Sequence, residues 1–321
     1  MNNLIAEHII SKPEDCSLLY IKNGETILSV NEHIKRPLAS IYKLIVLLEY
    51  LDQCEKGKIH SNDQVHFSQL KRFWIHPIDS AFMQWYHSVK GKIKKHSIAL
   101  NEVVKGMLQY SSNANTDYLI SILNMDEINK QLQKRHLVGH DPVIPISTSV
   151  LASLSEINIM HTPFSLGQLA QEYFKTMMKG NKIEGVDLNL LNDFDYENQC
   201  KWSDLLPHAS VKAYGEILKK LQYLQKSNKE LQSVMYWFNK LKNYKDFTGG
   251  MKLGYTPKVF NAALYTTDRF GNEYQLVYFL NNLSTLQRKE MEFASNDFHL
   301  KVLKDAFFIN QLKKQMCYVN A

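Results

Sequence analysis

The stretch PLASIYKLIVLLEYLDQC, residues 37–54, decides the architecture of this chain of 321 residues. From Ser40 to Cys54 its apolar side chains fall on nearly every side of a helix, which predicts a helix that is buried on most faces. The same stretch places Ser40 and Lys43 three residues apart, nearly one helical turn, so a hydroxyl and an amine share a face. We therefore expect a central helix whose first turn carries reactive side chains.

Strand signals lie near both ends of the chain. Residues 16–31 flank Asn23-Gly24, a dipeptide that tolerates the positive φ of a tight turn, and they predict a hairpin. Residues 260–265 and 274–280 bracket a turn-forming segment and predict a second hairpin. Strands at both ends imply one antiparallel sheet that the two ends of the chain build together.

Helical periodicity dominates the remainder. Residues 60–180 show helical periods broken by short loops, and residues 210–242 predict two helices joined near Ser227-Asn228. A last helix is expected over residues 289–314. Within the first region, residues 140–155 contain two prolines and many hydroxyls, which favours an irregular loop over a helix.

These patterns predict an α+β protein of two lobes, as expected for a chain longer than about 250–300 residues. Residues 1–55 together with 206–321 form an α/β lobe, an antiparallel sheet flanked by helices. Residues 56–205 form an inserted all-helical lobe. We expect the active site at the junction of the two.

The charge pattern argues against nucleic acid as a partner. The 38 Lys and Arg exceed the 32 Asp and Glu by only six charges, and the basic residues are spread along the chain. No apolar run approaches the roughly 20 residues that cross a bilayer, so we also expect no membrane partner. Nothing in the sequence sets the oligomeric state.

Four cysteines stand far apart without a Cys-x-x-Cys pair, so the sequence shows neither a zinc knuckle nor a redox motif, and a reduced protein fits it best. We expect no metal and no cofactor. The start of the sequence lacks a basic segment followed by an apolar core. We expect a cytoplasmic location, with export only if the start is a processed or trimmed end.

Ser40 and Lys43 suit nucleophilic catalysis. Backbone N–H groups at a helix start favour a developing alkoxide, and apolar surroundings lower the pKa of a lysine so that a neutral amine becomes accessible. The structural alternative is a serine cap with a snorkelling lysine, and an isolated S-x-x-K favours that alternative. Ser68 and Lys71 show the same spacing without further support. Other motifs in the chain must therefore distinguish a catalytic pair from a structural one.

Two further short motifs follow in order: Ser111-Ser112-Asn113 after a predicted helix, and Lys252-Leu253-Gly254 before the second hairpin. With Ser40 and Lys43, they make the chain resemble the penicillin-recognising serine enzymes, class A β-lactamases and penicillin-binding proteins, which carry S-x-x-K, S-D-N and K-T-G in this order. The resemblance covers most of the chain and implies a β-lactamase/transpeptidase-like fold.

The resemblance also implies roles. Ser40 would be the acylated nucleophile and Lys43 its proton acceptor, while Ser111 would relay a proton to the leaving group. Asn113 would bind a substrate amide, and Lys252 would orient Ser111 and attract a substrate anion. The backbone amides of Ser40 and Tyr255 would form the oxyanion hole. The predicted substrate-binding residues are Asn113, Gly254, Tyr255 and Thr256.

Three departures from the family pattern matter. Leu253 replaces the threonine whose hydroxyl binds the substrate carboxylate, and Thr256 substitutes for it only if the turn differs; Ser112 replaces the aspartate of S-D-N. Class A enzymes carry a glutamate that activates the deacylating water, yet residues 145–147, its expected place, hold no acid. Glu156 and Asp141 are the nearest candidates. Without such a base, the acyl-enzyme should hydrolyse slowly or pass its acyl group to another acceptor.

We therefore expect a serine hydrolase or acyltransferase that acts on a small-molecule or peptide-like donor, a β-lactam-like compound, amide or ester, and turns over penicillins poorly. The alternative is a catalytically idle protein of this fold that binds an anionic peptide-like ligand. In that case Lys252 and Asn113 would still matter for binding, and Ser40→Ala would leave ligand affinity nearly unchanged.

Overall fold

The computed structural model of the chain describes residues 3–76, 78–155, 162–181, 183, 194–235 and 244–319. It divides into two compact units. The sheet unit comprises Met1–Ile41, His208–Tyr223 and Trp237–Ala321, and the helical unit comprises Tyr42–Pro207 and Leu224–Tyr236.

The sheet unit contains a five-stranded antiparallel sheet in the order β2-β1-β9-β8-β7. Strand β1 from the start of the chain pairs with β9 near its end, with Leu18 opposite Tyr278. The sheet therefore joins both ends of the chain, as the sequence predicted. Asn23 and Gly24 have φ of 50° and 83°, the tight turn expected between β1 and β2. The strands are β1 (Cys16–Lys22), β2 (Glu25–Val30), β7 (Phe247–Thr256), β8 (Val259–Asp268) and β9 (Glu273–Leu280).

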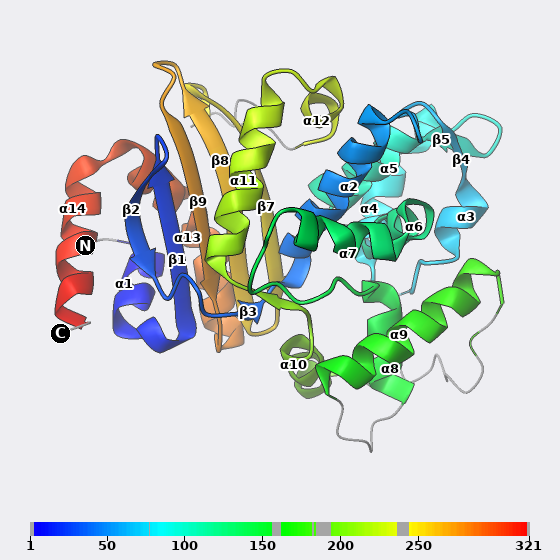
Figure 1. Cartoon of the computed structure of the whole chain (residues 1–321). Coiled ribbons are helices and arrows are strands. Elements are labelled where there is room, and N and C mark those ends of the chain that lie inside the picture. Colours follow the sequence, from blue (N-terminus) through cyan, green and yellow to red (C-terminus); the bar gives the residue numbers. More distant parts are fainter. Residues whose placement is uncertain are drawn as a thin grey trace. The chain divides into compact units, whose positions relative to one another are not determined.

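Helices cover both faces of this sheet (Figure 1). On one face α1 (Leu4–Ser11), α13 (Thr285–Lys304) and α14 (Ala306–Val319) share an apolar core with the strands. On the other, α11 (Val211–Gln225) lies close to β1, because a Cβ on Gly215 would come within 2.8 Å of the Leu19 side chain.

The single last helix expected over residues 289–314 is instead two helices, α13 and α14. Asp305 between them has extended backbone, with φ of −112° and ψ of 94°, and its side chain accepts a hydrogen bond from Phe308 N at 2.9 Å. The carboxylate therefore caps the start of α14. The helical spacing of apolar residues continues across this break, because the apolar residues of both helices pack into the same core.

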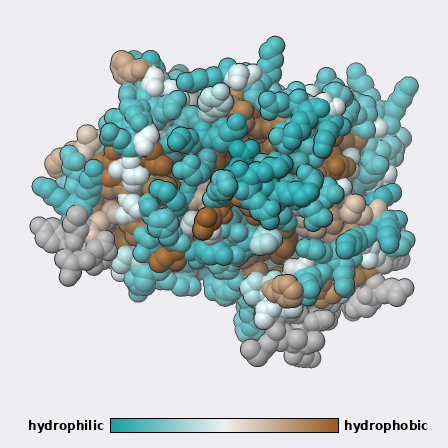
Figure 2. Space-filling view, in the orientation of Figure 1, coloured by the Kyte–Doolittle hydropathy of each residue, from teal (hydrophilic) through white to brown (hydrophobic). Residues whose placement is uncertain are grey.

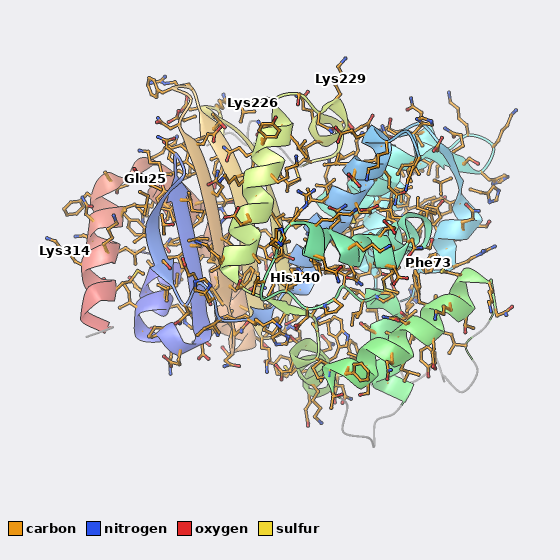
Figure 3. The ribbon with its side chains drawn as sticks, viewed as in Figure 1. Glu25, Phe73, His140, Lys226, Lys229 and Lys314 are labelled. Atoms are coloured by element: carbon orange, nitrogen blue, oxygen red, sulfur yellow. The ribbon has the colours of Figure 1, made fainter. Side chains whose placement is uncertain are left out.

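The helical unit is built around α2 (Lys43–Glu55), which is buried over most of its length as the sequence predicted. Phe73, labelled in Figure 3, packs against Phe174 with the two rings tilted and their centroids 5.4 Å apart. This unit is not helical throughout, since β4 (Gln64–His66) and β5 (Ser97–Ala99) pair antiparallel. Its other helices are α3 (Phe67–Lys71), α4 (Ser80–Val89), α5 (Leu100–Gln109), α6 (Asn113–Leu123), α7 (Met125–Lys134), α8 (Ile146–Ser155), α9 (Pro163–Met178), α10 (Tyr196–Asp204) and α12 (Lys229–Val234).

The predicted break near Ser227-Asn228 is confirmed, because α11 ends at Gln225 and Asn228 caps α12 by accepting a hydrogen bond from Leu231 N at 2.9 Å. The remaining short elements include β3 (Arg36–Pro37), which pairs with β6 (His208–Ala209), and the 3₁₀ turns η1 (Pro13–Asp15) and η3 (Lys90–Lys92).

The prediction of an irregular loop over residues 140–155 is wrong for its second half, which forms α8. Asp117, on α6, accepts hydrogen bonds from Ile146 N at 3.0 Å and Ser147 N at 2.8 Å. These are the first two amides of α8, so a carboxylate from another helix satisfies the donors that a local cap would otherwise serve. Such a cap leaves no local signature in the sequence.

The visible surface is mostly hydrophilic, with small separate apolar patches (Figure 2). Among the described residues, no helix combines the length and the apolar character that a bilayer span requires.

Candidate active site

Lys43, the first residue of α2, is completely buried, and its ammonium has three acceptors. Lys43 Nζ donates to Ser111 O at 2.6 Å and Asn113 Oδ1 at 2.9 Å, and it lies 3.2 Å from Ser111 Oγ. Burial lowers the pKa of Lys43 to about 8, against the opposing influence of the Asp79 and Asp117 carboxylates. Within the helical unit, the structure thus brings three of the predicted site residues together and lowers the lysine pKa in the expected direction.

The Ser111–Asn113 segment connects α5 to α6 in a strained conformation. Ser111 has φ of 62°, in the left-handed region that non-glycine residues rarely adopt. Ser112 caps α6 by accepting a hydrogen bond from Asn115 N at 3.2 Å. Gly106 on α5 allows the two helices to approach, because a Cβ there would lie 2.0 Å from Asn115 Nδ2. Close packing of α5 and α6 therefore presents the Ser111 and Asn113 oxygens to Lys43.

Asp79 is a residue of this cluster that the sequence analysis missed. It is 5% exposed, caps α4 through Phe82 N at 3.1 Å, and accepts a hydrogen bond from Ala114 N at 2.8 Å. Its oxygen Oδ2 also lies 3.1 Å from Ser112 Oγ. The sequence signal, an aspartate just before a helix, predicts a cap but not the contact with a segment more than thirty residues away.

Ser40 lies in the sheet unit, in a 3₁₀ turn, η2 (Ala39–Tyr42), that leads directly into α2. The α-helix therefore begins at Lys43 and not at Ser40 as expected. Strand β7 lies against this turn, because a Cβ on Gly254 would approach Ser40 N to 2.9 Å and Leu38 O to 3.0 Å. Only glycine fits here without displacing backbone, so the structure brings Gly254 to the Ser40 amide.

The Lys252-Leu253-Gly254 motif precedes the β8–β9 hairpin as predicted, and it lies inside β7, a strand that the sequence analysis did not predict. Neighbouring side chains on a strand point to opposite faces. Leu253 packs against the apolar core beneath α13, whereas Gly254 faces Ser40. Leucine at the family's threonine position thus contributes to packing.

The other predicted residues of β7 differ in exposure. Lys252 is buried and donates to Leu253 O at 2.7 Å, and Thr256 is buried at the end of the strand. Tyr255 is 55% exposed, with the Arg288 guanidinium 5.5 Å from its ring centroid. Tyr255 comes directly after Gly254, the residue at which β7 lies against the Ser40 turn.

Asp117 is the acid that the structure places beside residues 145–147. Its side chain is fully buried, and burial raises its pKa to about 7, against the hydrogen bonds from Ser147 and Ile146 and the charge of Lys43. Asp117 follows Asn113 by four residues on α6, so the sequence held a signal that both face one side. Of the two acids considered from the sequence, Glu156 lies outside the described residues, and Asp141 is half-buried between α7 and α8.

Within the described part of the chain, no group of three or more His, Cys, Asp or Glu side chains could hold a metal ion.

We compared the chain with protein-family models and with curated proteins. The family model described as the beta-lactamase enzyme family (Beta-lactamase2) matches residues 2–236. No curated protein matches the chain.

Several solved structures share the fold. A β-lactamase from Chitinophaga pinensis has a TM-score of 0.60 at 13% identity, covering 92% of this chain and 96% of that one. A representative class A β-lactamase from Bacteroides cellulosilyticus has a TM-score of 0.53 at 16% identity, covering 92% and 97%. PBP-A has a TM-score of 0.53 at 15% identity, covering 93% and 97%. They confirm the β-lactamase/transpeptidase-like fold.

Proposed function

This chain belongs to the beta-lactamase enzyme family, a family of serine hydrolases, and on that premise we propose that it forms an acyl-Ser40 intermediate. The acyl donor is a β-lactam-like compound, an amide or an ester. One observation carries the proposal: a fully buried Lys43 amine, with its pKa lowered to about 8, three residues after a serine in the family's motif.

The proposed chemistry begins when Ser40 Oγ attacks the acyl carbonyl and neutral Lys43 takes its proton. At pH 7 roughly a tenth of an amine with this pKa is neutral. The neutral amine keeps two N–H donors for Ser111 and Asn113, and its lone pair becomes available to the Ser40 proton. The oxyanion accepts hydrogen bonds from the Ser40 and Tyr255 amides, and the leaving group takes a proton by way of Ser111.

We expect this acyl-enzyme to hydrolyse slowly. Residues 145–147, the expected place of a deacylating acid, hold Pro145 and the first two residues of α8. The neighbouring carboxylate, Asp117, is fully buried and already accepts the amides of Ile146 and Ser147. A carboxylate in this position is poorly placed to activate water, so acylation should outpace deacylation.

A second candidate function is a catalytically idle protein that binds an anionic peptide-like ligand. It is favoured by Leu253, which contributes to the core at the position where family enzymes bind the substrate carboxylate with a hydroxyl. This hypothesis predicts that Ser40→Ala leaves ligand affinity nearly unchanged.

Intact-protein mass spectrometry distinguishes the two. Wild type, Ser40→Ala and Lys43→Ala are exposed to a fluorophosphonate and separately to penicillin G, and folding of each variant is checked by circular dichroism. Ser68→Ala is the matched control, because Ser68 heads the other S-x-x-K sequence and is exposed. We expect one adduct on wild type and on Ser68→Ala, and none on Ser40→Ala or Lys43→Ala. Absence of an adduct on wild type would favour the binding protein.

A further inference from the structure

We propose that Asp79 is a positioning residue: its carboxylate holds the segment that presents Ser111 and Asn113 to Lys43. The kinetic consequence of this inference rests on the proposed function, whereas the expected effect on Lys43 itself does not.

The contacts of Asp79 bracket Asn113 on both sides. Asp79 Oδ2 accepts a hydrogen bond from Ala114 N at 2.8 Å and lies 3.1 Å from Ser112 Oγ, whose other acceptor is Asn115 Oδ1 at 2.9 Å. These two contacts come from the residues immediately before and after Asn113. A carboxylate bound on both sides of Asn113 fixes the direction of the amide that accepts from Lys43.

Asp79 is itself firmly held. Its oxygen Oδ1 accepts from Phe82 N at 3.1 Å, and its backbone N–H donates to Ile75 O at 3.1 Å. Its backbone oxygen accepts from Trp74 Nε1 at 3.2 Å. The start of α4 therefore acts as a rigid support for the Ser111–Asn113 segment.

The segment needs such support because of its backbone. A non-glycine residue in the left-handed region costs on the order of 1 kcal/mol and persists only where surrounding contacts enforce it. Ser111 is in that region, with φ of 62°. Its flanking residue Ser112 carries a hydroxyl and no charge, so the negative charge buried at this segment comes from Asp79 on another element.

Lys43 has two carboxylates among the charged groups that act on it, Asp79 ahead of α4 and Asp117 on α6, and both raise its pKa against the larger effect of burial. They differ in what they hold. Asp117 binds the start of α8, whereas Asp79 binds the segment that contacts Lys43. Removing the Asp79 charge should therefore change both the ionisation of Lys43 and the geometry of its partners.

The test measures the two effects separately. Lys43 is titrated by NMR on protein with ¹³Cε-labelled lysine, with its signal assigned by its loss in Lys43→Arg, and acylation by penicillin G is followed by mass against pH. For Asp79→Asn we expect the Lys43 titration midpoint to fall by about one pH unit and acylation at its optimum to fall at least about tenfold. Asp79→Glu keeps the charge but shifts the oxygens, so it should keep the midpoint and lose acylation.

Glu102→Gln is the matched control, since Glu102 on α5 pairs with Lys92 and Lys105 and does not act on Lys43. It should leave the Lys43 midpoint unchanged. A folded Asp79→Asn protein with an unchanged midpoint and unchanged acylation would overturn the proposal. So would an Asp79→Asn protein that does not fold, unless Asp79→Glu folds with the expected pattern. If wild type is not acylated at all, the proposed function fails, and the NMR titration still decides the electrostatic role of Asp79.

Discussion

Gly254→Ala tests whether β7 and the Ser40 turn together supply the oxyanion hole. The added methyl group would lie 2.9 Å from Ser40 N and 3.0 Å from both Ile41 N and Leu38 O. All three are backbone atoms, so no side chain can rotate away and the strand or the turn must move. Overpacking of this kind costs about 1–3 kcal/mol of stability.

The effect on acylation should exceed the effect on stability. Moving the strand by a few tenths of an ångström changes the distance between the Tyr255 and Ser40 amides. Loss of one oxyanion donor typically slows the chemical step by about 10²–10³-fold. We therefore expect Gly254→Ala to remain folded and to acylate about 10²–10³-fold more slowly than wild type.

The assay is single-turnover acylation by penicillin G, followed by intact mass, alongside urea unfolding. Gly91→Ala is the matched control, because a Cβ at Gly91 meets nothing within 4 Å and its φ is not positive. That variant should match wild type in both measurements. If Gly254→Ala folds and acylates within about threefold of wild type, the two amides do not act on the oxyanion and the reasoning is refuted.

Three further predictions concern buried ionisable groups. The pKa of Lys43 is lowered to about 8, and its neutral form is the proton acceptor in the proposed reaction. Acylation should therefore rise with pH to a plateau above about 8, and Lys43→Arg should abolish this limb in a stopped-flow pH profile. The pKa of Asp117 is raised in the fold to about 7, so its protonated form favours folding; stability measured by urea unfolding should fall between about pH 4 and pH 7, and Asp117→Asn should flatten this slope. His299 is buried with its pKa lowered to about 3, so stability should fall below pH 6.5, by about 1 kcal/mol at pH 5.5, and a His299→Leu protein with the same slope would contradict this.

Much of the fold follows from local sequence patterns. The first hairpin, the buried α2 and the paired strands β8 and β9 each have a periodicity or a turn signal within a few residues. Strand β7 was missed because three of its ten residues are glycine, which weakens the strand signal, and its pairing with β8 supplies what local propensity lacks. The short β4–β5 pair escaped prediction for a related reason, since strands of three residues carry too little pattern.

The residues of the candidate site could be identified from the sequence, whereas their contacts could not. The order and spacing of the three motifs identified Ser40, Lys43, Ser111, Asn113 and Lys252 as residues to examine. Their roles remain predictions, whereas the contacts of Lys43 with Ser111 and Asn113 are now observed.

By itself the sequence determined the α+β class, the strands at both chain ends that imply one shared sheet, and the chemistry-bearing motifs, because each strand signal and each motif is a local pattern. Only the tertiary structure decided that Asp79 braces the Ser111–Asn113 segment, that Asp117 caps α8, and that Leu253 faces the core. Each of these depends on a partner at least 29 residues away in the chain or on the face that a strand buries. The physical reason is that a buried polar group needs a partner with correct geometry, and the fold, rather than sequence proximity, supplies it.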